Sequence, residues 1–327
     1  MSGQLLLLIG VFLAAMALRL PVFLAAALST VVYSQVYSAM SPIVLVQSLN
    51  RGLNQTAFAA IPLYFLAGAI MNAGGITQRL LRLAHALLAP FRGGLAHVNI
   101  GASMLFGGVS GSAVADASAI GSVMIPAMQK DGYPGAYAAA VTASSATIGL
   151  LVPPSIPMVM FGVFNNAPIG DLFIAGIVPG ILMGVYLLAV SAWIARRRGF
   201  AAHEWVGWRE LGLAARGSFY ALLLPVVIVS SLVGGLATAT EVAALACVYA
   251  AVVSTLVYRD IGWRELIRAV IESAVDSARI LSIIAVSGGA LWIVANSGAA
   301  DGLGDALARL ALSPTALSPH TMPPKPT

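Results

Sequence analysis

The 327-residue chain carries a formal net charge of +5, but only 9% of its residues are charged and 59% are apolar. Its mean hydropathy is +0.93, whereas a typical soluble domain has about 25% charged residues. These values exclude an ordinary soluble enzyme and predict an all-α polytopic membrane protein. The small basic surplus is explained by loop charge, and no basic stretch is interleaved with aromatic residues as nucleic-acid binding requires.

Apolar segments long enough to be membrane helices recur along the chain. They cover residues 4–18, 20–40, 57–73, 95–128, 136–163, 172–195, 219–236, 240–258 and 279–297. A bilayer core of about 30 Å needs about 20 helical residues, and most of these segments fit that length. No basic stretch precedes Leu5, so the first segment is predicted to be a span and not a cleaved signal.

The basic residues predict on which side of the membrane each connection lies. Arg79, Arg82 and Arg92 precede the 95–128 segment and Lys130 follows it, as expected if both ends of a hairpin share one side. Alternation then places further basic connections on that side: residues 196–198, 209, 216, 259, 264 and 268. The connections at 165–171 and 236–240, which carry no Lys or Arg, fall on the other side with the N-terminus. By the positive-inside rule, the basic side is cytoplasmic.

Two amphipathic segments are predicted to lie in the membrane interface. Residues 76–91 place four leucines on one helical stripe, namely Leu80, Leu83, Leu87 and Leu88, with arginines beside it. Residues 301–312 repeat this pattern. Residues 70–74 align with residues 294–298, and the charge assignment puts the two copies on opposite sides. This arrangement indicates an inverted-topology repeat.

The most informative stretch is residues 103–157. An apolar arm, Leu95–Val109, is followed by Ser110-Gly111-Ser112 and by a second arm, Ala113–Met128. Each arm has about 15 residues, or roughly 22 Å of helix, which is too short to cross. We therefore expect a re-entrant hairpin whose tip, Ser110–Ser112, lies near the middle of the membrane.

The next segment, residues 136–163, is long enough to cross, but prolines interrupt it at Pro153, Pro154 and Pro157. Proline removes a helical hydrogen bond and clashes with the preceding turn. Two interrupted segments side by side leave backbone groups and half-helix ends free to bind an ion or an anionic substrate.

The same stretch resembles a known family. Phe106–Ala117 reads FGGVSGSAVADA, Ile125–Met128 reads IPAM, and Ile148–Pro157 reads IGLLVPPSIP. These motifs are similar to the large membrane subunit of TRAP transporters, the DctM type, and the resemblance runs from about residue 4 to about residue 310. It implies an elevator-type, inverted-repeat secondary transporter and no enzyme activity.

The resemblance also implies a function and partners. Such a protein is a Na⁺-driven symporter that imports organic acids across a bacterial inner membrane, with its N-terminus predicted to be periplasmic. It works with a small four-span membrane subunit (DctQ type) and a periplasmic substrate-binding protein (DctP type), and it needs no cofactor besides the coupling ion. Segments 110–112 and 149–155 would hold Na⁺ and help to position the substrate carboxylate.

The candidate ion- and substrate-binding residues are Ser110, Gly111, Ser112, Asp116, Ser145, Thr147, Gly149, Pro153, Pro154 and Ser155, with Na⁺ expected at Ser110, Ser112, Gly149 and Pro153. Hydroxyl and carbonyl oxygens without a carboxylate cluster suit Na⁺ better than a transition metal.

Alternatives remain at each of these positions. The tip residues could be a small-residue helix contact, and the hydroxyls near Gly149 could satisfy backbone carbonyls freed by the kink. Asp116 is a cation partner, a proton carrier or an anion at a helix N-terminus. Glu241, which opens a segment, is predicted to be a helix N-terminal partner.

The predicted organisation is a scaffold of spans (1–75), an interfacial arm (76–94), a transport region (95–171), further spans that begin a second repeat (172–300), a second arm (301–312) and a disordered, proline-rich tail (313–327). The family pattern has a second hairpin and a second Pro-Pro span after the second arm, and both are missing here. The sequence therefore predicts a C-terminally truncated permease in which one of two half-sites is present and which does not transport by itself.

Two rival functions follow from the residues. A non-transporting scaffold would bind the small subunit without flux. An intramembrane serine protease would use the G-x-S-G of residues 108–111, but no histidine lies within a span downstream of Ser110, and a serine without a base is not activated.

Overall fold

The computed structural model describes residues 3–37, 43–44, 46–47, 50 and 56–296. All regular structure in these residues is helical. The chain divides into two compact units, one formed by residues 1–54 with 279–327 and the other by residues 55–278. The predicted second arm (301–312), the tail (313–327) and the end of the repeat at 294–298 lie outside the described residues.

The first unit contains α1 (Gly3–Ala17), α2 (Val22–Tyr37) and the last part of α13 (Trp263–Asn296). Its core is formed by Leu8, Tyr33 and Ile293. The two N-terminal helices match the first two predicted segments, and Pro21 precedes α2, where a proline's missing N–H is tolerated.

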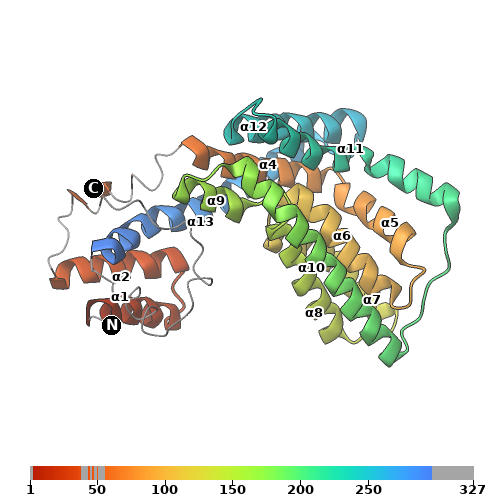
Figure 1. Cartoon of the computed structure of the whole chain (residues 1–327), viewed down its shortest axis with the longest axis horizontal. Coiled ribbons are helices and arrows are strands. Elements are labelled where there is room, and N and C mark those ends of the chain that lie inside the picture. The colour runs from red at the N-terminus through yellow and green to blue at the C-terminus, as the bar shows by residue number, and fades with distance from the viewer. Residues whose placement is uncertain (1–2, 38–42, 45, 48–49, 51–55, 297–327) are drawn as a thin grey trace, which may run out of the picture. The chain divides into compact units, whose positions relative to one another are not determined.

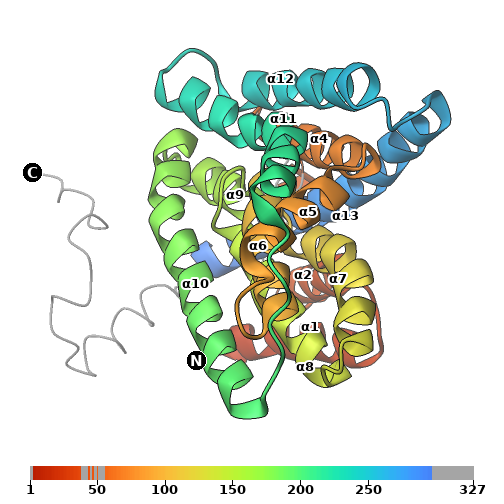
Figure 2. The same ribbon diagram turned by 90° about the vertical axis from the view of Figure 1, so that its right-hand side faces the viewer.

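The second unit holds the remaining helices. They are η1 (Thr56–Ala59), α4 (Ala60–Ala73), α5 (Ile76–Leu88), α6 (Gly94–Ser110), α7 (Ala113–Lys130), α8 (Gly135–Ala146), η2 (Thr147–Leu150), α9 (Ile156–Asn165), α10 (Ile169–Arg198), α11 (Gly207–Val233), α12 (Ala239–Val252), the π-helical η3 (Val253–Val257) and the first part of α13. Helices α6, α7, α8 and α10 pack together around α6, while α4 packs on α12 and α5 packs on α11 (Figures 1 and 2).

Among the described residues, four helices are long and apolar enough to cross a membrane: 169–198, 207–233, 239–257 and 263–294. A fifth candidate is the pair 57–73 and 76–88, bent by 69° between its two helices. The sequence placed the last span at 279–297, but α13 begins at Trp263. Charged side chains lower the hydropathy of its first turns without breaking backbone hydrogen bonds, so the helix starts before the apolar run does.

The connections between helices lie together at the ends that the charge pattern predicts. At one end, Gly93 N donates to Ala201 O (3.2 Å), and His203 lies 3.4 Å from Asp131. The 89–93, 130–134 and 199–206 connections, all assigned to the basic side, therefore meet. The pKa of His85 is lowered there, mainly by burial and secondarily by the adjacent His203.

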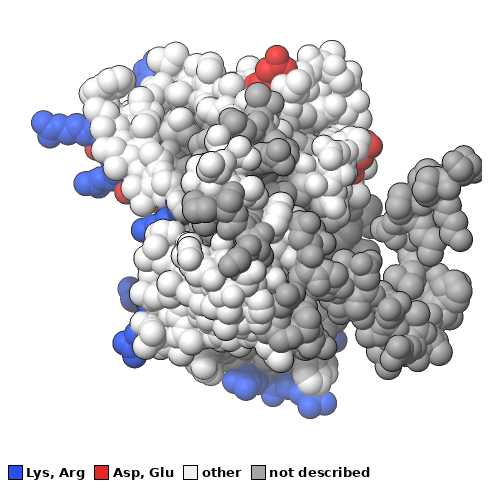
Figure 3. Space-filling model, turned by 90° about the vertical axis from the view of Figure 1, so that its left-hand side faces the viewer, with Lys and Arg blue, Asp and Glu red and all other residues white. Residues whose placement is uncertain are grey.

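At the other end, the 165–170 and 236–239 connections, which carry no Lys or Arg, line one cavity together. Where Figure 3 draws described residues, the surface is mostly white, with Lys and Arg side chains along the left and lower margins and acidic side chains at the top and right. This distribution is consistent with helices that present apolar sides to lipid and charged ends to water.

Helix α5 turns its leucine stripe toward protein. Leu80 and Leu83 are buried, whereas Leu87 is exposed. The stripe packs on α6 and α11, and Ala86 and Leu83 share a small cluster with Ala214 of α11. The predicted amphipathic helix is present, but most of its apolar face is covered by neighbouring helices. Helix α5 is therefore a brace between α6 and α11.

Arg79 links α5 to the connection that follows η3 through an ion pair and a cation–π contact. Its guanidinium pairs with the Asp260 carboxylate and lies 4.0 Å from the centroid of the Tyr258 ring. The Arg79 carbonyl accepts a hydrogen bond from Ser218 Oγ of α11 (2.9 Å). Gly75, which begins α5 with φ +69°, abuts Asp260, so a side chain there would press on the carboxylate. We call this set the Arg79 clasp.

We expect Arg79→Ala to lower the free energy of unfolding by about 1–2 kcal/mol, because a partly exposed ion pair contributes up to about 1 kcal/mol and a cation–π contact about 0.5–1 kcal/mol. The matched control is Arg82→Ala. Arg82 pairs with Glu210 (2.6 Å), but its side chain is 57% exposed against 29% for Arg79, and no ring lies beneath it among the described contacts. Thermal unfolding in detergent micelles measures both. Equal losses for the two variants would contradict the clasp.

Candidate functional site

The predicted hairpin tip is a break between two helices. Helix α6 ends at Ser110, and Gly111 adopts φ +60°, a left-handed conformation that favours glycine. Ser112 is extended, and its Oγ caps α7 by accepting a hydrogen bond from Ala115 N (3.4 Å). The Ser110 hydroxyl is buried and bonds only weakly, with Ser112 N at 3.4 Å and Ser112 O at 3.5 Å. The Ser-Gly-Ser sequence thus ends one helix and begins the next.

The two arms fold back on each other. Asn99 Nδ2, near the start of α6, lies 3.6 Å from Met128 Sδ, near the end of α7. Residues 29 positions apart at the open ends of the arms are therefore in contact, which only an antiparallel hairpin permits. Helices α6 and α7 therefore form an antiparallel helical pair joined at Ser110–Ser112.

The segment after the hairpin is interrupted as predicted. Helix α8 tightens into η2 and stops at Leu150, and residues 151–154 are not helical. Ser155 then caps α9 by accepting a hydrogen bond from Met158 N (3.4 Å), while its own Oγ donates to Leu150 O (2.5 Å). We call residues 151–155 the Pro-Pro break. Its backbone groups cannot all pair within a helix, and Ser155 satisfies one of the freed carbonyls.

The tip and the Pro-Pro break lie against each other. Ile156 N donates to Gly111 O (3.4 Å). A Cβ atom on Gly111 would lie 2.3 Å from Pro154 O, and one on Gly107 would lie 2.7 Å from Gly149 Cα. Backbone therefore meets backbone along a seam between α6 and the η2–α9 segment. Only residues without side chains allow this approach.

The structure brings most of the candidate residues to this seam. The approaches across it join Gly107 to Gly149, Gly108 to Pro153, and Gly111 to Pro154 and Ile156. Ser110 and Ser112 flank Gly111, and Ser155 follows Pro154. The hydroxyls of Ser145 and Thr147 have other partners. Ser145 Oγ lies 3.0 Å from Ser103 Oγ of α6, and Thr147 Oγ1 donates to Ser144 O (2.6 Å) and lies 3.9 Å from Met183 Sδ of α10.

Asp116 lies behind the seam, completely buried. Its Oδ2 is 4.0 Å from the position that a Gly149 Cβ would occupy. The Ser103 hydroxyl is the polar side chain that interacts with this carboxyl group, although the contact is too long or too poorly aligned to be a regular hydrogen bond to either carboxylate oxygen. Ser112 caps α7 through its side chain, and Asp116 lies in the first turn of the same helix, where the helix dipole also favours a carboxylate.

Sequence reasoning identified Ser145 but missed the buried polar residues beside it, Asn99, Ser103 and Thr142. Asn99 Nδ2 donates to Thr142 Oγ1 (2.7 Å), and one turn further along α6, Ser103 meets Ser145. Asn99, Ser103 and Ser145 are buried, and Asn99 Oδ1 has no partner. Polar residues four apart on an otherwise apolar α6, facing similarly spaced polar residues on α8, were the signal that could have found these residues.

Within residues 56–296, Ser110 has no histidine placed to activate it. Ser110 Oγ contacts only the Ser112 backbone among the described hydrogen bonds. His97 is on the same helix, 13 residues earlier in the sequence, which is about 20 Å along the axis. A base at that distance cannot take the proton from the serine hydroxyl.

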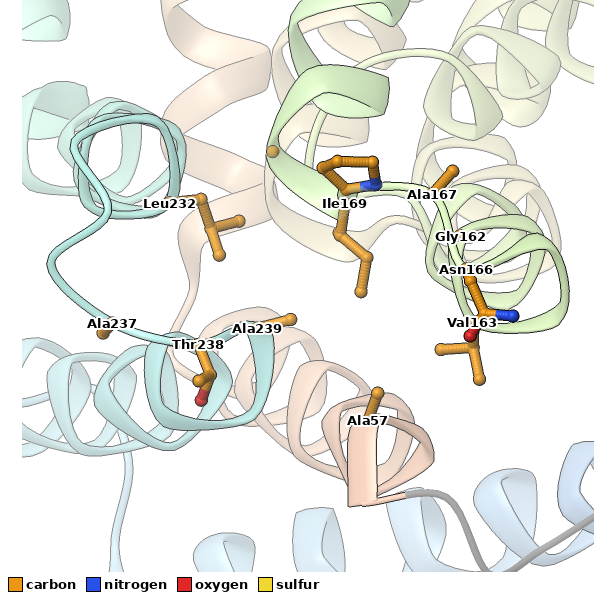
Figure 4. A pocket seen from close by; sticks show the side chains of 12 residues that line it. Ala57, Gly162, Val163, Asn166, Ala167, Ile169, Leu232, Ala237, Thr238 and Ala239 are labelled. Carbon is orange, nitrogen blue, oxygen red and sulfur yellow. The ribbon is translucent and has the colours of Figure 1, made fainter.

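A separate cavity of about 370 Å³ lies where the 165–170 and 236–239 connections meet (Figure 4). Leu232, Ile169 and Ala57 point toward its centre, whereas the polar atoms of Asn166 and Thr238 point away. Thr238 instead forms a capping box with Glu241, confirming Glu241 as a helix N-terminal partner. The side chains that point into this cavity are apolar.

Comparison with known proteins gives the site its context. The family model described as "Tripartite ATP-independent periplasmic transporter, DctM component" matches residues 9–318. Three relatives are similar to the chain. The sialic acid TRAP transporter permease protein SiaT of Haemophilus influenzae is 39% identical over 74% of this chain and 39% of its own length. The C4-dicarboxylate TRAP transporter large permease protein DctM of Pseudomonas aeruginosa is 41% identical over 69% of this chain and 53% of its own.

The third relative, the isethionate TRAP transporter permease protein DctMQ of Oleidesulfovibrio alaskensis, is 39% identical over 70% of this chain and 36% of its own length. The chain thus matches between about a third and about half of each of these three proteins. The family match covers nearly the whole chain, and it agrees with a helical membrane protein that contains a hairpin and an interrupted segment. The chain belongs to the DctM family of tripartite ATP-independent periplasmic transporter components.

Proposed function

We propose that the chain is the membrane permease part of a Na⁺-driven importer of organic acids. The observation that carries this proposal is the seam, where the tip and the Pro-Pro break meet with an unpaired, buried carboxylate behind them. Non-helical backbone at membrane depth is tolerated only where it is buried in protein or lines a cavity. A bound cation at the seam would account for non-helical backbone at this depth, and the nearby Asp116 carboxylate would balance its charge.

A cation at the seam would meet hard oxygen ligands. The tip supplies the hydroxyls of Ser110 and Ser112, and the other side supplies the carbonyls of Gly149 and Pro153. Asp116 adds a negative charge within a few ångströms of Gly149. A buried carboxylate without a partner is unfavourable by several kcal/mol, so a monovalent cation nearby would be strongly stabilised. Oxygen ligands favour Na⁺ over transition metals.

The substrate class rests on the relatives. Their names specify sialic acid, C4-dicarboxylates and isethionate, each of which is an organic acid ionised at neutral pH. We infer that this chain handles an organic acid anion. The N-terminal end of α7, which opens at the tip, would favour the anionic group through the helix dipole.

The partners follow from the family description, which names a component of a tripartite system. We infer a small membrane subunit of the DctQ type and a periplasmic substrate-binding protein of the DctP type. We place the chain in a bacterial inner membrane with residues 89–93, 130–134 and 199–206 in the cytoplasm and the N-terminus in the periplasm. The 165–170 and 236–239 connections then face the periplasm.

In this arrangement the hairpin, α8 and α9 move as one block. The seam joins the hairpin to the η2–α9 segment through backbone contacts, so the two cannot slide apart without losing them. Helix α5 lies between this block and α11, and the Arg79 clasp fixes its outer side. The motion we infer is elevator-like, with the block crossing past a fixed scaffold.

The test uses Na⁺-dependent thermal stabilisation of the purified chain in detergent, with choline as the comparison cation. Ser110→Ala removes one neutral ligand, worth about 0.5–1.5 kcal/mol, so the half-saturating Na⁺ concentration should rise about three- to tenfold. The control is Ser122→Ala, which removes an exposed hydroxyl on α7 that bonds only to Ala119 O (3.0 Å). Ser122→Ala should not change the response.

Three outcomes separate the rivals. Ser110→Ala with an unchanged Na⁺ response would contradict a cation at the tip. Binding of the small subunit with no Na⁺ response in the unsubstituted chain would leave the scaffold function. Proteolysis abolished by Ser110→Ala would support a protease.

A further inference from the structure

Two arginines from separate parts of the fold line one cavity at the basic end of α10. The cavity has a volume of about 470 Å³, and its walls are Arg92, Ala195, Arg196 and residues 199–202. Arg92 belongs to the connection between α5 and α6, and Arg196 belongs to the last turn of α10. The cavity is therefore lined by two cationic side chains that are more than a hundred positions apart in the sequence.

The loop after α10, which forms most of the cavity wall, is fixed by contacts with the rest of the fold. The left-handed Gly199 (φ +71°) ends α10 and turns the chain, and Phe200 packs against Tyr133, with ring centroids 4.2 Å apart. Gly93 N donates to Ala201 O (3.2 Å), which ties the Arg92 connection to the loop after α10. The two arginines are thus mounted on segments that hydrogen-bond to each other.

The positive charge of the cavity is not neutralised. Neither Arg92 nor Arg196 forms an ion pair with any acidic residue in the described part of the chain, unlike Arg79 and Arg82. The nearby Asp131 carboxylate is directed to His203. Arg92 and Arg196 are both exposed. Their guanidinium groups are free to donate to an anion.

An exposed apolar face of α10 leads to this cavity. The large exposed side chains on the helix include Val178, Leu182, Val185, Tyr186 and Trp193. Arg196 follows Val178 by 18 residues, which is about five helical turns, so the two lie on the same face. Trp193, against which Arg197 stacks at 4.3 Å, stands where an aromatic side chain marks the boundary between lipid tails and head groups.

We propose that this cavity binds the phosphate of an anionic phospholipid, whose acyl chains lie along the exposed face of α10. The planar guanidinium fork is suited to phosphate oxygens, and basic pockets at the ends of membrane helices take anionic head groups. The proposal requires only that α10 crosses the bilayer and does not depend on Na⁺ coupling. With the orientation proposed above, the lipid belongs to the cytoplasmic leaflet.

The experiment adds lipids to the delipidated chain in detergent and follows thermal unfolding. Phosphatidylglycerol should stabilise the chain saturably, and Arg92→Ala/Arg196→Ala should raise the half-saturating concentration at least tenfold. The matched control is Arg209→Ala/Arg216→Ala, which removes the same charge from two exposed arginines of α11 that do not line the cavity. The control should keep the response of the unsubstituted chain.

A lysine pair, Arg92→Lys/Arg196→Lys, retains the charge without the fork and should give an intermediate affinity, which keeps the test informative if the alanine pair folds poorly. Equal losses in the α11 control would reduce the effect to general charge attraction and overturn the proposal. Phosphatidylcholine acting as well as phosphatidylglycerol, or inorganic phosphate saturating the same response, would also overturn it. If the Arg92→Ala/Arg196→Ala protein lost binding of the small subunit but kept its response to lipid, the proposal would be overturned and the exposed face of α10 would be assigned to a protein partner.

Discussion

Gly111→Ala should abolish the Na⁺-dependent stabilisation of the chain. Gly111 has φ +60°, where an L-residue costs about 1–2 kcal/mol, and its new Cβ would lie 2.3 Å from Pro154 O. Backbone cannot yield as a flexible side chain can, so the tip and the Pro-Pro break must separate. The ligands proposed on the two sides would then no longer face the same ion.

The control for this variant is Gly132→Ala. Gly132 also has a left-handed φ, +85°, but nothing lies within 4 Å of the position that its Cβ would take. It should show the conformational destabilisation alone and keep the Na⁺ response. Thermal unfolding with and without Na⁺ measures both variants. A Gly111→Ala protein that responds to Na⁺ like Gly132→Ala would disprove the seam as the ion site.

Asp116→Asn should make the chain more stable than the unsubstituted protein without Na⁺, and it should weaken the stabilisation that Na⁺ provides. Without Na⁺, removing a buried charge that has no partner should stabilise the chain by about 1–3 kcal/mol. With Na⁺, the variant should lose the stabilising ion, and the half-saturating Na⁺ concentration should rise at least about tenfold, because tenfold corresponds to only 1.4 kcal/mol. The measurement is a Na⁺ titration of the unfolding temperature for both proteins.

Asp171→Asn is the matched control, since Asp171 lies in the first turn of α10 but is exposed. If Asp116 served only as an anion at a helix N-terminus, the two substitutions would both destabilise slightly and neither would alter the Na⁺ titration. A loss of stability in Na⁺-free buffer for Asp116→Asn would therefore argue against the unpaired carboxylate.

The hairpin and the Pro-Pro break could be predicted because their causes are local. A glycine flanked by serines and two adjacent prolines each interrupt a helix locally, whereas the single prolines 126, 179 and 225 lie inside α7, α10 and α11. The arms are slightly longer than the sequence predicts, with 17 residues in α6 and 18 in α7. The grouping of connections by charge was predictable for the same reason, since it needs only the order of Arg and Lys along the chain.

The seam could not be predicted, because it depends on which glycine faces which backbone across more than forty residues of sequence. The contact of Gly107 with Gly149 arises from the packing of α6 against η2, and no local pattern specifies it. The direction of the Ser145 hydroxyl had the same origin: its partner, Ser103, lies on another helix. The stripe on α5 was correctly identified as apolar, but hydropathy does not distinguish a protein neighbour from lipid.

The backbone-to-backbone seam constrains how such a permease can diversify. Where ligands are side chains, evolution can adjust a site one substitution at a time. In the ion site proposed here, Ser110, Ser112 and Asp116 could be adjusted in this way, but the peptide oxygens of Gly149 and Pro153 could not, because a substitution would only disturb the close backbone packing around them. If the ion binds at this seam, new cargo would be accommodated by surfaces away from Gly107, Gly111 and Gly149, and the same ion site would serve chemically different molecules.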